Sequence, residues 1–164
     1  MKTVHLIRHA KSSWNDLSLT DVERPLNKRG RKACRLMAEP ILRAGCNFDK
    51  VYCSIAQRAQ MTIEGISRAL ENREIEWDFD DALYTFSSHN LYQRCRELDD
   101  YLNDVVLVGH NPAMTEFCNI MGNRTIANLP TCGYAQLRFP RKTWESLSPG
   151  SAETVAFLTP KNIR

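Results

Sequence analysis

Short apolar runs recur along the chain, and their aliphatic and β-branched residues are typical of β-strands. They lie at 3–8, 50–54, 75–79, 105–110, 134–139 and 153–158. The run at 105–110, VVLVGH, is almost continuously apolar. Such a run indicates a strand that is buried on both faces of a parallel sheet.

Four stretches between these runs carry apolar residues at helical spacing, and they predict helices at 27–44, 54–70, 90–102 and 111–122. Pro40 should kink or split the first of them. Ser54 and Gln57 have the spacing of a capping box at the start of the second. Asn111-Pro112 is a typical helix start for the fourth.

Strands that alternate with helices predict a layered α/β fold, here a three-layer α/β/α sandwich with a mostly parallel sheet. The runs at 134–139 and 153–158 have no clear helix between them, which suggests antiparallel additions and therefore a mixed sheet. No repeat, low-complexity segment or long linker divides the chain. We therefore expect one domain over 1–164.

Composition narrows the class of protein. The net charge of +3 is weak, and no basic stripe with interleaved aromatic residues indicates a nucleic-acid partner. No apolar run is long enough to span a bilayer, and no signal peptide is evident, so we expect a soluble cytoplasmic protein without a membrane partner. The six cysteines lack metal-site spacing and predict reduced core thiols.

The residues with the most reactive chemistry follow three of the predicted strands. Arg8 and His9 end the first, Ser54 ends the second with Arg58 one helical turn later, and His110 ends the run at 105–110. Ligands of open α/β sheets bind beyond the carboxyl ends of the strands. If these strands are neighbours, two arginines and two histidines meet in one pocket, which suits a tetrahedral phosphoryl group.

The same cations disfavour protonation of a neighbouring imidazole, so His9 is a plausible neutral nucleophile. An arginine and histidine pocket can supply the charge stabilisation that a metal ion otherwise provides. No carboxylate cluster resembles a metal cage, and we expect no metal and no cofactor.

Four segments resemble the motifs of the histidine phosphatase superfamily, which is also called phosphoglycerate mutase-like: LIRHAKS, ERPLNKRG, CSIAQRAQMT and LVGHNP. The short length and the segments RHAKSSW and LVGHNP are most similar to its SixA-like branch. Characterised members of that branch remove phosphate from phosphohistidine in proteins. The resemblance implies the phosphoglycerate mutase-like fold and a phosphorylated protein or small molecule as substrate.

The resemblance also implies a role for each matching position. His9 matches the nucleophile that is transiently phosphorylated, and Arg8 and Arg58 match the arginines that hold the phosphate. His110 matches the second histidine, which binds the phosphoryl oxygens. Asn15 falls where larger members often carry a phosphate-pocket asparagine.

One position departs from the family pattern. Many members carry a carboxylic general acid where this chain has Thr85. Nearby acidic residues, none of which is clearly the acid, are Asp80, Asp81, Asp16, Asp21 and Glu23. A phosphorylated imidazole needs a proton donor less than an alkoxide does, so the sequence favours a phosphohistidine substrate. A phosphatase for small phosphomonoesters and a phospho-ligand-binding module with little turnover remain alternatives.

Overall fold

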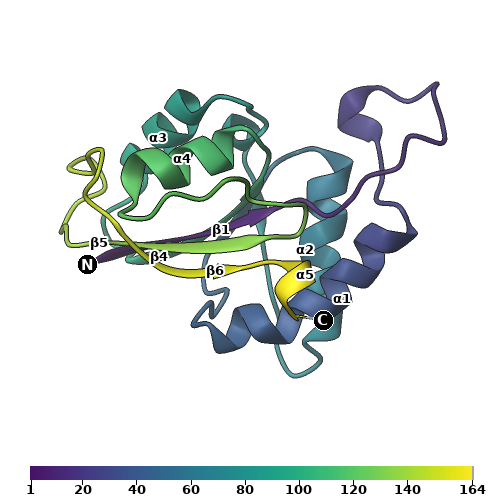
Figure 1. Ribbon diagram of the computed structural model, residues 1–164, viewed down its shortest axis with the longest axis horizontal. Coiled ribbons are helices and arrows are strands. Elements are labelled where there is room, and N and C mark those ends of the chain that lie inside the picture. Colours follow the sequence, from purple (N-terminus) through teal and green to yellow (C-terminus); the bar gives the residue numbers. More distant parts are fainter. Residues whose placement is uncertain (164) are drawn as a thin grey trace.

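The computed structural model describes residues 1–163 and forms one sheet between two layers of helices (Figure 1). The strands are β1 (Lys2–Arg8), β2 (Val51–Cys53), β3 (Asp78–Phe79), β4 (Asp104–Gly109), β5 (Tyr134–Phe139) and β6 (Glu153–Leu158). The α-helices are α1 (Lys28–Arg43), α2 (Gln57–Ala69), α3 (Ser88–Arg96), α4 (Ala113–Met121) and α5 (Pro160–Ile163). Two 3-10 turns, η1 (Asp21–Glu23) and η2 (Asp81–Leu83), lie in the connections.

The strand order is β3-β2-β4-β1-β5-β6. The pairs β3–β2, β2–β4 and β4–β1 are parallel, whereas β5 runs antiparallel to both β1 and β6. The prediction of a mixed sheet, in which the last two strands of the chain are antiparallel additions, is therefore confirmed. In this order β2, β4 and β1 are neighbours, and their carboxyl ends meet at one edge.

Each face of the sheet buries its own apolar cluster. Helices α3 and α4 cover one face, where Phe117 and Met121 of α4 belong to the same apolar cluster as Val4 and Leu6 of β1. Helices α1 and α2 cover the other face, where Met37 and Ile63 contribute to a second cluster. Both clusters are almost fully shielded from solvent, as a three-layer fold requires.

Three local predictions need correction. The third strand is limited to Asp78–Phe79 rather than 75–79, because its partner β2 offers only a short edge for pairing. Helix α3 covers Ser88–Arg96 rather than 90–102, and the chain beyond it continues in tight turns, in which the Leu98 and Leu102 N–H groups donate to the Cys95 and Asp99 carbonyls three residues back. Helix α1 is not split at Pro40: the proline lacks the N–H that would bond to the Leu36 carbonyl, but it lies in the last turn, so only residues 41–43 of the helix follow it.

The predicted capping box at Ser54 does not form. Helix α2 begins at Gln57, with Ala56 at the N-cap position. The Ser54 hydroxyl instead accepts a hydrogen bond from the Ala56 N–H and lies 2.8 Å from His110 Nε2. Within residues 1–163, no helix is long and apolar enough to cross a membrane.

Candidate active site

The sheet brings together the four residues that the sequence placed at the strand ends. Arg8 ends β1 and His9 follows it, Arg58 is the second residue of α2, and His110 follows β4. The His9 and His110 ring centroids are 5.2 Å apart. Arg58 Nη2 lies 3.4 Å from His110 Nδ1. The parallel pairing of β1, β4 and β2 positions these side chains, since all three strands end at the same edge.

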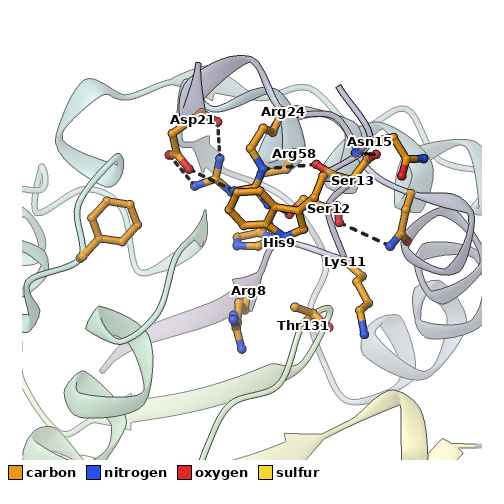
Figure 2. Close-up of a pocket in the computed structure, with 13 residues that line it drawn as sticks. Arg8, His9, Lys11, Ser12, Ser13, Asn15, Asp21, Arg24, Arg58 and Thr131 are labelled. Carbon is orange, nitrogen blue, oxygen red and sulfur yellow. Dashed lines mark hydrogen bonds and ion pairs between the residues drawn. The ribbon is translucent and has the colours of Figure 1, made fainter. Parts of the chain in front are cut away.

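A pocket of about 670 Å³ opens over this edge (Figure 2). Most of its lining side chains are polar or charged. The lining residues are Arg8, His9, Lys11, Ser12, Ser13, Trp14, Asn15, Asp21, Arg24, Asn27, Arg58, Phe86 and Thr131. His110 is 2% exposed and lies beneath the pocket beside His9. Asn15 lines the pocket but is exposed, so it belongs to the rim.

The backbone around His9 is anchored on three sides. The His9 N–H donates to the carbonyl of Gly109 at the end of β4, at 3.0 Å. The Cys132 N–H donates to the His9 carbonyl at 3.1 Å, and the Ala10 N–H donates to Thr62 Oγ1 at 2.8 Å. The imidazole is therefore carried on a rigid support.

The His9 ring is held in one tautomer. Its Nδ1 lies 2.7 Å from the Ala10 carbonyl, which can only accept, so Nδ1 carries the proton and Nε2 keeps its lone pair. Burial lowers the pKa of His9 to about 4, and the positive charges of Arg58, Arg8 and Arg24 act in the same direction. The hydrogen bond to Ala10 opposes them. At neutral pH the ring is uncharged, as a nitrogen nucleophile requires.

His110 is uncharged for similar reasons. Burial lowers the pKa of His110 to about 3, and the neighbouring His9 and Arg58 lower it further. Ser54 bonds to its Nε2, and the Tyr84 and Phe86 rings each lie 5.4 Å from its ring centroid. The ring is thus fixed in position and shielded from solvent.

The two arginines are oriented by different partners. Arg8 Nη1 donates to the Leu129 carbonyl at 3.0 Å, while its buried Nε has no protein partner. Arg58 is 3% exposed and donates to Asp21 twice, from Nη1 to the main-chain oxygen at 2.7 Å and from Nη2 to Oδ2 at 3.0 Å. A buried N–H without a partner is costly, so Arg8 Nε is an unsatisfied donor next to the pocket.

Sequence reasoning missed the network around Asp21. Its carboxylate accepts hydrogen bonds from Arg58, from Arg24 Nη1 at 3.1 Å and from the Tyr84 hydroxyl at 2.6 Å. Burial raises the pKa of Asp21, but these hydrogen bonds outweigh it and bring the pKa to about 2. Arg24 is the second residue of the quoted segment ERPLNKRG, and Asp21 lies two residues before that segment, which was the only available signal.

The structure also places the residues weighed as a general acid. Thr85 accepts hydrogen bonds from the Ser87 N–H and the Asn90 side chain at the start of α3. Asp80 is engaged by Arg94 at 2.6 Å. Among the described residues that line the pocket, Asp21 is the only carboxylate, and its low pKa keeps it ionised at neutral pH.

His5 and the cysteines belong to the core rather than to the pocket. His5 is fully buried, with Nδ1 2.6 Å from the Tyr134 hydroxyl and Nε2 2.9 Å from Asp104 Oδ1, which confirms the expectation of a core histidine. All six cysteines are free and buried, as expected for core thiols. In residues 1–163, no group of three or more His, Cys, Asp or Glu side chains could hold a metal ion.

The relatives that match by sequence include an uncharacterized plant protein and a phosphoglycerate mutase. An uncharacterized chloroplastic protein of Arabidopsis thaliana is 27% identical over 150 residues, which cover 85% of this chain and 67% of the relative. A 2,3-bisphosphoglycerate-dependent phosphoglycerate mutase of Bartonella henselae is 35% identical over 77 residues, which cover 46% of this chain and 37% of the mutase. The matched segment thus spans little more than a third of the mutase.

By structure, the chain is similar to a protein of Agrobacterium tumefaciens assigned as the phosphohistidine phosphatase SixA. The TM-score is 0.78 and the identity 25%, over 97% of this chain and 98% of that protein. The expected phosphoglycerate mutase-like fold is confirmed, and the similarity extends to the SixA-like branch. The family model described as histidine phosphatase superfamily (branch 1) matches residues 4–93, more than half of the chain. With that match and this pocket, the chain belongs to the histidine phosphatase superfamily.

Proposed function

We propose that this protein is a metal-independent phosphatase that acts on phosphohistidine in proteins through a phosphorylated His9. Family membership supports a phosphohydrolase with phosphorylated substrates. The observation that carries the narrower proposal is the pocket itself. It combines the uncharged nucleophile His9 with two arginines, Arg8 and Arg58, and a single lining carboxylate among the described residues, Asp21, which is ionised.

In the first step, Arg8 and Arg58 bind the phosphoryl oxygens. Bidentate guanidinium groups match these oxygens and neutralise their charge. His110 lies against Arg58 and His9, so it is placed to contact the same group. His9 Nε2 then attacks phosphorus as the bond to the leaving group breaks.

The identity of the leaving group follows from the missing acid. An alkoxide needs a proton in the transition state, and a positioned acid contributes about 10²–10⁴ in rate. Asp21 carries no proton to give at neutral pH. A phosphorylated imidazole that is protonated on its other nitrogen departs as a neutral ring, so it needs no acid from the enzyme.

In the second step, water attacks phosphorus on His9, the P–N bond to Nε2 breaks, and inorganic phosphate is released. The net reaction consumes one water and returns the substrate histidine and His9 unphosphorylated. Positive charge in the pocket stabilises the transition state in both steps. The arginines would thereby supply the stabilisation that a metal ion provides in other phosphatases.

A turnover assay with a chelator tests this proposal. A phosphohistidine peptide and a phosphoserine peptide of the same sequence are compared, with His9→Ala and, as a matched control, His89→Ala, which removes an exposed histidine. We expect cleavage of the phosphohistidine peptide, its loss in His9→Ala and its retention in His89→Ala. Turnover that survives His9→Ala would reject His9 as the nucleophile.

Other outcomes select the alternatives. Cleavage of the phosphoserine peptide alone would retain the mechanism but replace the substrate by phosphomonoesters. Phosphate binding without turnover of either peptide would indicate a phospho-ligand-binding module. Activity that the chelator abolishes would contradict metal independence.

A further inference from the structure

Two large aromatic side chains line the pocket and remain exposed. Trp14 is 69% exposed and Phe86 is 48% exposed. They are the only apolar side chains among the described residues that line the pocket. Exposed aromatic residues at a binding cavity mark a surface that a ligand covers.

Both rings are held from behind by residues of the site rather than by the core. The guanidinium carbon of Arg24 lies 3.3 Å from the Trp14 ring centroid, so one face of the indole is occupied. Phe86 packs 5.4 Å from the His110 ring and 5.9 Å from Tyr84, which meets it edge-on. Each ring is therefore fixed on one side and free on the side exposed to solvent.

The rings come from separate segments of the chain. Trp14 belongs to the connection between β1 and α1, and Phe86 to the connection between η2 and α3. Because the phosphoryl group is expected on the arginine and histidine floor, the rest of the substrate must leave the pocket past its outer walls. Those walls include Trp14 and Phe86.

We propose that Trp14 and Phe86 are specificity-determining residues that contact the leaving imidazole of a phosphohistidine side chain. This inference rests on the proposed function and names the part of the site that recognises the ring. A planar ring pairs with aromatic side chains through offset or edge-to-face contacts, which an alkyl or amine leaving group cannot make. The cationic floor and the aromatic walls together match an anionic phosphoryl group bonded to a flat ring.

The test uses two substrates with the same bond to phosphorus. A phosphohistidine peptide and phosphoramidate both carry a P–N bond, but only the peptide carries a ring. The measured quantity is the ratio of kcat/KM for the peptide to kcat/KM for phosphoramidate. Dividing one by the other removes any general effect of a substitution on phosphoryl transfer.

We expect Trp14→Ala and Phe86→Ala each to lower this ratio by about 2- to 10-fold, which is the contribution of a single aromatic pair. The conservative variants Trp14→Phe and Phe86→Tyr should retain most of the ratio. Tyr101→Ala is the matched control, because Tyr101 is 77% exposed and does not line the pocket. It should leave the ratio unchanged.

The failures are distinguishable. An unchanged ratio in both alanine variants, including the case of equal losses of kcat/KM on both substrates, would refute the role of Trp14 and Phe86 in specificity. The proposed function would stand. A wild-type protein that does not cleave the phosphohistidine peptide would overturn the proposed function and this inference together. A similarly lowered ratio in Tyr101→Ala would show that the effect is not specific to residues of the pocket. That result would also overturn the inference.

Discussion

The Asp21 carboxylate offers a quantitative test of how the pocket is assembled. The substitution Asp21→Asn keeps the shape of the side chain but removes the charge that Arg58, Arg24 and Tyr84 contact. These partners come from α2, from the end of η1 and from the segment after η2. One carboxylate thus joins three segments around the pocket.

The size of the effect follows from the pKa of Asp21. A decrease from 3.8 to about 2 corresponds to roughly 2.4 kcal/mol at about 1.36 kcal/mol per pKa unit. The side chain is 46% exposed, so solvent screening reduces this figure to about 1 kcal/mol. We expect Asp21→Asn to lower the free energy of unfolding by that amount at pH 7.

The dependence on pH has a definite sign. A carboxyl group whose pKa is lower in the folded state stabilises the fold above its unfolded pKa, and this contribution is lost as the pH falls through the folded value. The free energy of unfolding should therefore differ between wild type and Asp21→Asn by nearly the whole amount above pH 4. The difference should fall to about half at pH 3 and vanish below about pH 2.

Urea denaturation at pH 7 and pH 3 measures this difference. Asp16→Asn is the matched control, because Asp16 lies in the same connection but its carboxylate accepts hydrogen bonds only from Ser18. We also expect Asp21→Asn to raise KM, since Arg58 loses its orienting partner. Equal stability of wild type and Asp21→Asn at pH 7, or a difference that stays constant down to pH 3, would refute the reasoning.

Three further outcomes follow from the structure. Gly30→Ala would press a Cβ against the Lys11 carbonyl oxygen beside the pocket. It should lower the free energy of unfolding, measured by urea denaturation, by about 1–3 kcal/mol, and unchanged stability would contradict this close contact. With pKa values of about 4 and 3, the His9 and His110 rings should stay neutral in NMR titrations down to about pH 5, whereas titration near 6.5 would contradict their burial. Burial raises the pKa of Cys53 to about 12, so iodoacetamide should leave turnover unchanged at pH 7; rapid inactivation would show a reactive thiol at the site.

The fold was largely predictable because its strands are strongly apolar. The VVLVGH run indicated a buried parallel strand, and β4 occupies an interior position between β1 and β2. Because parallel strands end at a common edge, this prediction also placed Arg8, His9, Arg58 and His110 near one another. Their proximity is thus a consequence of topology that residue order already contained.

The connection between β1 and α1 could not be predicted in the same way. It is polar, without helical or strand period, so nothing in the sequence indicates where it folds. Its position depends on contacts with distant residues, such as the bond between Asp21 and Tyr84, 63 residues apart. Asp21 was consequently weighed only as a possible general acid, and Arg24 was not recognised as a member of the site.

The prediction of a helix cap from local sequence also failed, because the capping residue instead bonds to a histidine of the site. Ser54 has the spacing of a capping residue, but its hydroxyl bonds to His110 Nε2, and α2 begins at Gln57 with Ala56 as its N-cap. A hydrogen bond across 56 residues outweighed a local preference. Such a departure is expected where a side chain contributes to a functional pocket.

The central claim, that His9 carries the phosphoryl group during turnover, can be measured directly. The protein is mixed with a phosphohistidine peptide in the presence of a chelator, quenched within the first turnover in alkali, and mapped by mass spectrometry. We predict phosphate on His9 in the wild type and in His89→Ala, and none on the protein in His9→Ala. Phosphate on any other residue, or turnover with no phosphorylated protein at any time before completion, would contradict the account.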